Sequence, residues 1–356
     1  MKKRTIYGFF IALFAVTLFT GCGKTITMSS PENFDIHTEK QREALDAGID
    51  NFLKFAFGTK EWSAPEKAVL TWETGKEKPD SCILRFSDNA ELKDAKEIST
   101  AENSFAVGNL EIGKTYYWQV EYENKKGKTI KSEIASFTTD DKAPRNLFVD
   151  GVTNVRDLGG WKTENGHVKQ GLVFRSARLN DNGKETVSVT EDGIRTMKEE
   201  LGIKTELDLR QGEIRTSSAL GEDVNYVNIP IPGTVTTQLR MHDESVKKVF
   251  TLFADENNYP ILVHCSVGTD RTGLVSFMLN GLLGVAEEEL YIDYAFSNFG
   301  KIGSLRKYEE IRESYVSVIK QFPGASLSEQ IENYLKEVGI TDAQINEIKR
   351  IMKVEE

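Results

Sequence analysis

The chain has 356 residues, a formal net charge of −10 and 39% hydrophobic residues. A usual domain has about 100–200 residues, so this length indicates two domains and a short appendage. The composition excludes collagen, extensive disorder and a polytopic membrane protein, and the acidic balance argues against nucleic acid as a partner. Three cysteines are too few for a disulfide framework, so apolar burial must hold the core.

The first residues have the layout of an export signal. Three cations at positions 2–4 precede an apolar run over 6–20 that is too short to span a bilayer comfortably. The run ends in Phe19-Thr20-Gly21-Cys22, which resembles a bacterial lipobox; an ordinary signal peptide with a chance cysteine is the alternative. We expect residues 1–21 to be removed. Cys22 would then carry acyl chains that anchor the exported protein to a cell or outer membrane, on a periplasmic or extracellular face.

Residues 22–60 contain one stretch with helical spacing, whose apolar residues recur from Leu45 to Phe57. This stretch is either a short helix that docks on a domain or part of a spacer. We assign residues 22–60 as a tether. A polar joint that contains proline, over 140–145, is the best candidate for a linker further along the chain.

Between residues 61 and 140 the hydrophobic period changes to two, which predicts half-buried strands. The expected strands cover residues 67–73, 81–87 and 115–123. Aromatic residues along the last strand indicate a core face, with a carbohydrate- or protein-binding surface as the less favoured alternative. Cys82 is expected to be a buried, inert thiol. The segment 110–116 resembles a corner of fibronectin type III domains, which implies an N-terminal all-β sandwich without chemistry of its own.

After residue 145, short buried strands alternate with helices. We expect strands over 204–209 and 260–264, and helices over 191–201 and 270–283. This alternation predicts an α/β domain over residues 145–356, with a mostly parallel sheet flanked by helices.

The segment from Pro260 to Gly273 carries the expected chemistry. A buried strand ends at His264, a short loop follows, and a helix begins near Arg271. Such a loop aims successive backbone N–H groups at one point beside the positive end of a helix, which suits a phosphate group. The candidate substrate-binding residues are Ser266, Val267, Gly268, Thr269 and Thr272.

Cys265 is the candidate nucleophile, because loop amides and a helix terminus lower the pKa of a thiol. Arg271 can curl back over the loop and bind two phosphate oxygens with its planar guanidinium. Thr272 can donate its hydroxyl to the sulfur, and Gly268 permits a tight turn. His264 either orders the loop or is a satisfied core histidine. Neither a metal nor another cofactor is expected, since Arg271 and the amides supply the positive field.

His264-Cys265, followed after five residues by Arg271-Thr272, resembles the signature of cysteine-dependent protein tyrosine and dual-specificity phosphatases. Rhodanese-like loops also place a cysteine after a strand, but their spacing differs. A narrower resemblance, to the bacterial secreted tyrosine phosphatases with an N-x-R-D-L-G-G opening, covers nearly the whole second domain. It rests on residues 154–160, 173–179, 202–210 and 293–298.

This resemblance implies attack of Cys265 on phosphorus and protonation of the leaving oxygen by a general acid. Asp208, at the end of a strand, resembles the family's proposed acid and is slightly favoured. Asp270, inside the loop, is the competitor; its structural alternative is to cap the helix or pair with a cation.

Three further polar residues are expected mainly to support the structure. Asp157 is expected to organise a turn, although it could pair with Arg156 near the site. Arg175 and Arg178 are either cations at the substrate rim or structural pairs, and we favour the structural interpretation.

One departure from the family concerns substrate. The family commonly has lysine where this chain has Thr269, and that lysine is linked to polyanionic substrates. Its loss weakens the attraction for multiply charged head groups. We therefore expect a protein-tyrosine phosphatase acting on a phosphotyrosyl protein or peptide. A phosphoinositide or inositol-phosphate phosphatase is the alternative, and a non-catalytic lipoprotein that binds phosphorylated or carbohydrate ligands is less favoured.

Overall fold

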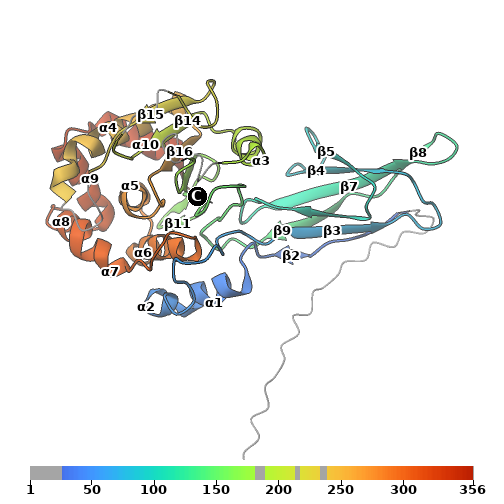
Figure 1. Ribbon diagram of the computed structural model, residues 1–356, viewed down its shortest axis with the longest axis horizontal. Helices are drawn as coiled ribbons and strands as arrows, with labels where there is room; N and C mark the ends of the chain where they lie inside the picture. The colour runs from blue at the N-terminus through green and yellow to red at the C-terminus, as the bar shows by residue number, and fades with distance from the viewer. Residues whose placement is uncertain (1–25, 181–188, 213–216, 233–238, 356) are drawn as a thin grey trace, which may run out of the picture. The chain divides into compact units, whose positions relative to one another are not determined.

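The computed structural model describes residues 26–180, 189–212, 217–232 and 239–355 (Figure 1). The chain divides into two compact units, each built from separate segments. The first comprises Met1–Asp35, Lys67–Val107 and Gly113–Asp140, and the second comprises Ile36–Glu66, Gly108–Ile112 and Asp141–Glu356.

The first unit is all-β over its described residues. Its smaller sheet is antiparallel and has the order β1 (Thr27–Ser29), β3 (Ala68–Glu73), β6 (Ser104–Val107). Its larger sheet has the order β2 (Asn33–Phe34), β9 (Ala135–Thr139), β7 (Thr115–Glu123), β4 (Cys82–Ser87), β5 (Lys96–Thr100), with β8 (Thr129–Lys131) paired to β7.

Alternate residues of these strands are buried, as the period of two predicts. Tyr116, Trp118 and Tyr122 on β7 are at most 8% exposed, so the aromatic residues form a core face. Cys82 is also buried and is a free thiol. The expected strands and the burial of Cys82 are therefore confirmed, whereas the inertness of its thiol and the resemblance to fibronectin type III domains stay predictions.

The second unit is built on a five-stranded sheet. Its order is β10 (Arg156–Asp157), β13 (Val173–Ser176), β16 (Ile261–His264), β14 (Thr205–Asp208), β15 (Asn225–Asn228). Only β10 runs antiparallel to its neighbour; the other pairs in this sheet are parallel. Every residue of β16 is buried, as expected for a parallel strand whose two faces are both covered.

Helices cover both faces of this sheet. Phe174 and Leu262 pack in a cluster with Met197 and Leu201, around α3 (Glu191–Arg195) and the π turn η1 (Thr196–Glu200). Val173 and Val263 point to the opposite, larger cluster. That cluster includes side chains of α4 (Asp243–Phe253), α5 (Asp270–Leu282), α9 (Leu327–Glu337) and α10 (Asp342–Met352). The predicted mostly parallel sheet with flanking helices is confirmed.

The remaining elements of this unit are short apart from α6 (Glu287–Phe296). They are η2 (Leu239–His242), η3 (Glu256–Asn258), η4 (Ser297–Phe299), α7 (Tyr308–Ile311), η5 (Arg312–Val316), α8 (Ser317–Ile319) and a small sheet of β11 (Lys162–Thr163), β12 (Gly166–Val168) and β17 (Lys353–Val354).

The predicted tether over residues 22–60 is corrected for residues 36–60, which belong to the α/β unit. A capping box at Thr38 starts α1 (Glu39–Ala47), and Gly48, with φ of +68°, separates it from α2 (Ile49–Phe52). Phe52 packs in a buried cluster with Phe296 and Phe299. The apolar residues with helical spacing are therefore a docking face, which was the alternative interpretation. The predicted linker over residues 140–145 is also corrected. Asp140 is the last residue of the all-β unit, and the α/β unit resumes at Asp141.

The expected signal peptide and lipidation site at Cys22 lie outside the described residues, so they stay predictions. Within the described ranges, no helix combines the length and the apolar character needed to cross a bilayer.

Candidate active site

The register of the parallel strands brings the expected site residues to one edge of the sheet. Ser176, Asp208 and His264 are aligned at the carboxyl ends of β13, β14 and β16. Ligand sites of α/β sheets lie outside this edge. The loop from Cys265 to Asp270 leaves the central strand here and leads into α5.

Gly268 lets this loop lie against the neighbouring strand. Its φ is +71°, and a Cβ atom at this position would lie 2.3 Å from the carbonyl oxygen of Ser176. Any larger residue would combine an unfavourable backbone conformation with a collision against backbone. The predicted tight turn is confirmed.

The Cys265 thiol is buried, and its surroundings favour the thiolate. Burial alone would raise the pKa of the thiol. The Arg271 guanidinium, the Thr272 hydroxyl and the backbone amides of Val267 and Thr272 outweigh burial, so this pKa is lowered. Within the described part of the chain the Thr272 hydroxyl makes no other hydrogen bond. These groups meet around the sulfur as the sequence predicted.

Arg271 returns over the loop that precedes it. Its Nη2 donates to Oγ of Ser266 at 2.9 Å, and its Nη1 donates to the Leu209 carbonyl oxygen at 3.3 Å. The Arg271 side chain stays partly exposed, whereas Cys265 is buried. This arrangement can hold a tetrahedral oxyanion.

Two side chains bind the outer carbonyl oxygens of the loop. Nδ2 of Asn154 donates to the Val267 carbonyl at 3.0 Å, and Nη2 of Arg175 donates to the Gly268 carbonyl at 2.7 Å. In a trans peptide the C=O and the next N–H point in opposite directions. Fixing these carbonyls outward therefore turns the amides of Gly268 and Thr269 inward, toward an anion.

The structural interpretation of Arg175 is confirmed, because this arginine is fully buried and paired with Asp293 at 2.5 Å. Arg178 lies beside the loop, and its backbone N–H donates to the Ser266 carbonyl at 3.3 Å. The sequence did not reveal the role of Asn154. The backbone of Asn154 is left-handed, with φ of +60°, and this conformation directs the side-chain amide to the loop. A single sequence does not predict such a conformation.

The side chain of Thr269 is fully buried and faces away from solvent. Its hydroxyl donates to the Val267 carbonyl at 3.4 Å and accepts from Asn154 at 3.4 Å. The predicted contact between Thr269 and substrate stays a prediction, and in this structure only its backbone amide could make it. The side chain serves the loop instead.

His264 orders the loop from below. Its Nε2 lies 2.9 Å from Oε1 of Glu206, and its Nδ1 lies 3.4 Å from the carbonyl oxygen of Cys265. Burial would lower the imidazole pKa, but Glu206 and Asp208 outweigh burial and raise it. The hydroxyl of Ser218 and the amide of Ala219 hold the other oxygen of Glu206. A charged residue within a buried strand was the sequence signal for Glu206, and it was missed.

Asp208, the slightly favoured general acid, lies in a tight hydrogen-bond network, and its role stays a prediction. Asp208 is 2% exposed, and it accepts from the backbone N–H and Nη2 of Arg210 and from the Tyr226 hydroxyl, at 2.7–3.0 Å. Burial raises the pKa of this carboxyl, yet Arg210 and His264 lower it more. These contacts favour the ionised carboxylate, so Asp208 would have to give up partners before it could carry a proton to a leaving group.

Asp270 remains as the carboxylate of the loop itself. Its Oδ1 accepts from Nε of Arg306 at 3.0 Å and from the Tyr294 hydroxyl at 3.3 Å, and its side chain is 16% exposed. The predicted pairing with a cation is therefore present. Asp157 organises a turn through the amides of Gly159 and Gly171, and its ion-pair partner is Arg145 instead of Arg156.

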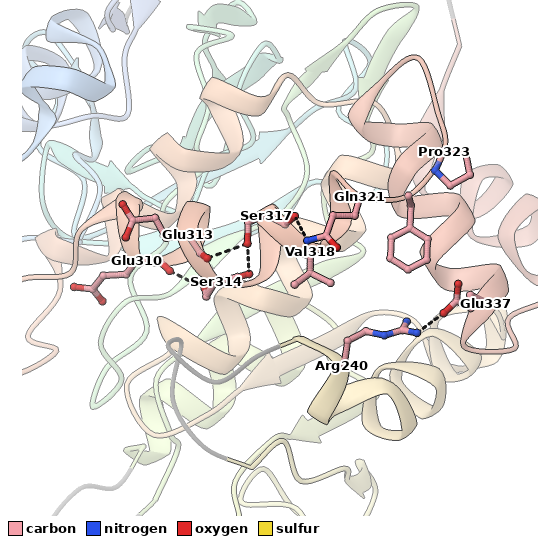
Figure 2. A pocket seen from close by; sticks show the side chains of 10 residues that line it. Arg240, Glu310, Glu313, Ser314, Ser317, Val318, Gln321, Pro323 and Glu337 are labelled. Carbon is pink, nitrogen blue, oxygen red and sulfur yellow. Dashed lines mark hydrogen bonds and ion pairs between the residues drawn. The ribbon is translucent and has the colours of Figure 1, made fainter.

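A groove of about 890 Å³ lies elsewhere in the α/β unit (Figure 2). It is lined by residues of η2 and of the segment from α7 to α9, among them Arg240, which pairs with Glu337. None of the loop residues 265–271 lines it. Among the described residues, no group of three or more His, Cys, Asp or Glu side chains is placed to hold a metal ion.

Sheet, loop and helix together define a phosphatase-like α/β domain with the loop 265–270 at the carboxyl edge of its sheet. The tyrosine phosphatase family matches residues 147–353, which is more than half of the chain. The chain belongs to the tyrosine phosphatase family.

Relatives of this chain carry the same family name. A tyrosine-protein phosphatase of Nostoc commune is 25% identical over 195 residues, 42% of this chain and 66% of that protein. A Cupriavidus necator protein named as a candidate tyrosine-protein phosphatase is 26% identical over 180 residues, 43% of this chain and 63% of that protein. The chain thus spans slightly less than two thirds of either relative.

Among solved structures, the core catalytic domain of the PP-IP phosphatase SIW14 from S. cerevisiae, in complex with citrate, resembles this chain. Its identity is 17%, with a TM-score of 0.32 over 43% of this chain and 88% of that chain. A likeness of this degree says nothing about substrate.

Proposed function

We propose that this protein is a cysteine-dependent protein-tyrosine phosphatase that hydrolyses phosphomonoesters through a cysteinyl-phosphate intermediate. The Cys265 thiolate attacks phosphorus; an S–P bond forms, and the P–O bond to the leaving group breaks. Water then attacks phosphorus, the S–P bond breaks, and inorganic phosphate and the thiolate are released. The observation that carries this proposal is the meeting of the Cys265 thiol with Arg271, the Thr272 hydroxyl and the backbone amides of Val267 and Thr272, which together lower its pKa.

Each group around the sulfur has a part in this mechanism. Arg271 and the amides hold the equatorial phosphoryl oxygens as charge moves onto them, and they are preorganised, which makes this stabilisation large. Thr272 donates to the sulfur and stabilises it as nucleophile and as leaving group.

For the general acid we favour Asp270 over Asp208, because its side chain is 16% exposed against 3% for Asp208 and its hydrogen bonds are longer. It is the partly exposed carboxylate on the loop, next to the guanidinium that binds phosphate. A phenol has a pKa of about 10, so a tyrosyl oxygen needs less protonation as it leaves than an alkyl oxygen does. This favours aryl phosphates as substrates.

Phosphate release by matched cysteine variants tests the activity. Cys265→Ser should lose at least about a thousandfold in kcat, because the serine hydroxyl is not ionised at neutral pH. Cys82→Ser, at the other buried free cysteine, is the control and should keep the parent rate. Equal rates for Cys265→Ser and the parent would refute the proposal.

The same assay ranks the substrates. We expect phosphotyrosyl peptides to be cleaved faster than phosphoseryl peptides, phosphoinositides or inositol phosphates. A strong preference for phosphoinositides or inositol phosphates would make the protein a phosphatase of that class. Vanadate binding without turnover of any substrate would leave a non-catalytic binding protein.

We also propose, from sequence alone, that the protein is exported and anchored through an acyl-modified Cys22. The net charge after removal of residues 1–21 would be −13, so acyl chains and not charge would hold it to a membrane. In this proposal the all-β unit is a fibronectin type III-like spacer or interaction module. Cys22→Ala should move the protein from the detergent phase to the aqueous phase on partitioning, and an unchanged distribution would refute the anchor.

A further inference from the structure

We propose that Asp293, far from the loop in sequence, is the positioning residue that holds the phosphate-binding loop in shape. This inference rests on the proposed function for its catalytic meaning. Its structural basis is that both side chains that hold the loop carbonyls are traced back to this one carboxylate on α6.

The first arm runs through Arg175. Oδ2 of Asp293 accepts from Nη1 of Arg175 at 2.5 Å, and Nη2 of the same guanidinium donates to the Gly268 carbonyl at 2.7 Å. One planar group thus connects the carboxylate to the loop, and rotation of the guanidinium would break both bonds.

The second arm runs through Arg156 and Asn154. Oδ1 of Asp293 accepts from Nε of Arg156 at 2.7 Å, and Nη1 of Arg156 donates to Oδ1 of Asn154 at 2.5 Å. Because the amide oxygen of Asn154 is taken, its Nδ2 faces the loop and donates to the Val267 carbonyl. The two arms therefore end on consecutive carbonyls, whose fixed direction turns the next two amides inward.

The charges of two buried arginines explain why a carboxylate is needed at position 293. Arg156 and Arg175 are at most 1% exposed. Burial and the repulsion of Arg175 lower the pKa of Arg156 to about 10, while Asp293 opposes this change. Without the carboxylate, two buried like charges would face each other, and at least one guanidinium would have to move and release its carbonyl. With it, one positive charge remains in excess behind the loop, where it favours a bound anion.

The chain offers a matched control for a merely structural effect. Asp157 is also a buried carboxylate that binds one buried arginine, Arg145 at 2.8 Å, and two backbone amides. It makes no bond to the loop 265–271 among the described contacts. Asp157→Asn therefore alters a buried carboxylate–arginine pair without removing a bond to the loop.

The test compares Asp293→Asn and Asp157→Asn in the full chain. The ionisation midpoint of Cys265 is measured from the pH dependence of its alkylation by iodoacetamide, read by mass spectrometry on the peptide that contains Cys265. Orthovanadate affinity is measured in parallel. Asp293→Asn should raise the midpoint and weaken vanadate binding about tenfold or more, the scale of lost outer-shell support. Asp157→Asn should change neither quantity, even if its melting temperature falls as far.

A folded Asp293→Asn with the parent midpoint and vanadate affinity would overturn the inference. If this variant does not fold, Asn154→Gly cuts one arm, keeps all charges and tolerates the left-handed backbone; it should shift both quantities in the same direction. Unchanged values for Asn154→Gly would overturn the inference equally. Failure of this inference can be told from failure of the proposed function. The proposed function fails if the parent protein shows no Cys265-dependent phosphate release, whatever the vanadate affinities of the variants.

Discussion

The close approach of the Ser176 carbonyl restricts position 268 to glycine. The loop passes so close to β13 that an added methyl group would lie 2.3 Å from the Ser176 carbonyl oxygen. Backbone cannot yield here as a flexible side chain would, so the loop itself must move. The amides that face the anion would move with it.

Gly268→Ala is expected to lower kcat by about a hundredfold or more, the scale of losing one oxyanion donor. Gly303→Ala is the matched control, because Gly303 also has a positive φ, +97°, but a Cβ atom added there would meet nothing within 4 Å. Both variants carry backbone strain, and only one displaces the loop. Equal kcat for the two variants would show that the contact with Ser176 is not what matters.

The His264–Glu206 pair makes stability depend on pH. Glu206 raises the folded-state pKa of His264 above 6.5, so its stabilisation is lost as the pH rises through that raised pKa. Burial raises the Glu206 pKa, but His264 and Ser218 lower it more, so its stabilisation is lost as the pH falls below 4.5. The pair therefore stabilises most between 4.5 and 6.5. The difference in unfolding free energy between parent and Glu206→Gln should be largest in that window; a pH-independent difference would contradict this.

The sequence predicted the reacting side chains but not the side chains that hold them in position. Cys265, Arg271 and Thr272 lie within one short segment, so their meeting follows from local geometry. Asn154 bonds the loop from a distant segment and depends on a left-handed backbone, whereas Glu206 bonds His264 and depends on strand register. The partner of Asp270, Arg306, lies 36 residues further along the chain, and no spacing rule connects the two.

At the scale of elements, hydrophobic period decided which strands and helices form. The strand predicted over 115–123 coincides with β7, and the helix predicted over 270–283 ends one residue early as α5. In the stretch from Leu45 to Phe57 the helical period was predicted correctly, but a stripe of apolar residues does not indicate the surface against which it packs. The partner is α6 with the turn η4 that follows it.

Two phenylalanines of this stretch allow a test of whether it docks on the domain. Phe52 is fully buried, whereas Phe57 is 49% exposed. Phe52→Ala should lower the free energy of unfolding by about 3–5 kcal/mol, because it leaves a cavity against α6 and η4. Phe57→Ala should change it by less than about 0.5 kcal/mol. Urea unfolding of the full chain measures both, and equal effects would show that the stretch does not dock.

At the scale of the whole molecule, the α/β unit is larger than the family match over 147–353. Residues 36–66 belong to it, and among them Ser63 contacts Asn154, which binds the loop. Oγ of Ser63 accepts from the Asn154 backbone N–H at 3.3 Å, and the Ser63 carbonyl accepts from Asn146 at 2.8 Å. Residues 108–112 also belong to it, through two backbone carbonyls that bind Arg145. Sequence could not show this, because both segments are separated from the domain by strands of the all-β unit.

A fragment of residues 145–356 should therefore be a poor phosphatase. It would expose Phe296 and Phe299, which Phe52 covers in the full unit, and it would leave Asn154 without Ser63 and Arg145 without its carbonyl partners. We expect a melting temperature at least about 5 °C below that of residues 26–356, since losses of 1 kcal/mol or more shift the midpoint by degrees. We expect at least about a tenfold lower kcat, since small misplacements of a positioned site are costly. Equal melting temperatures and equal rates would show that the outlying segments are dispensable and that the family match alone bounds the catalytic unit.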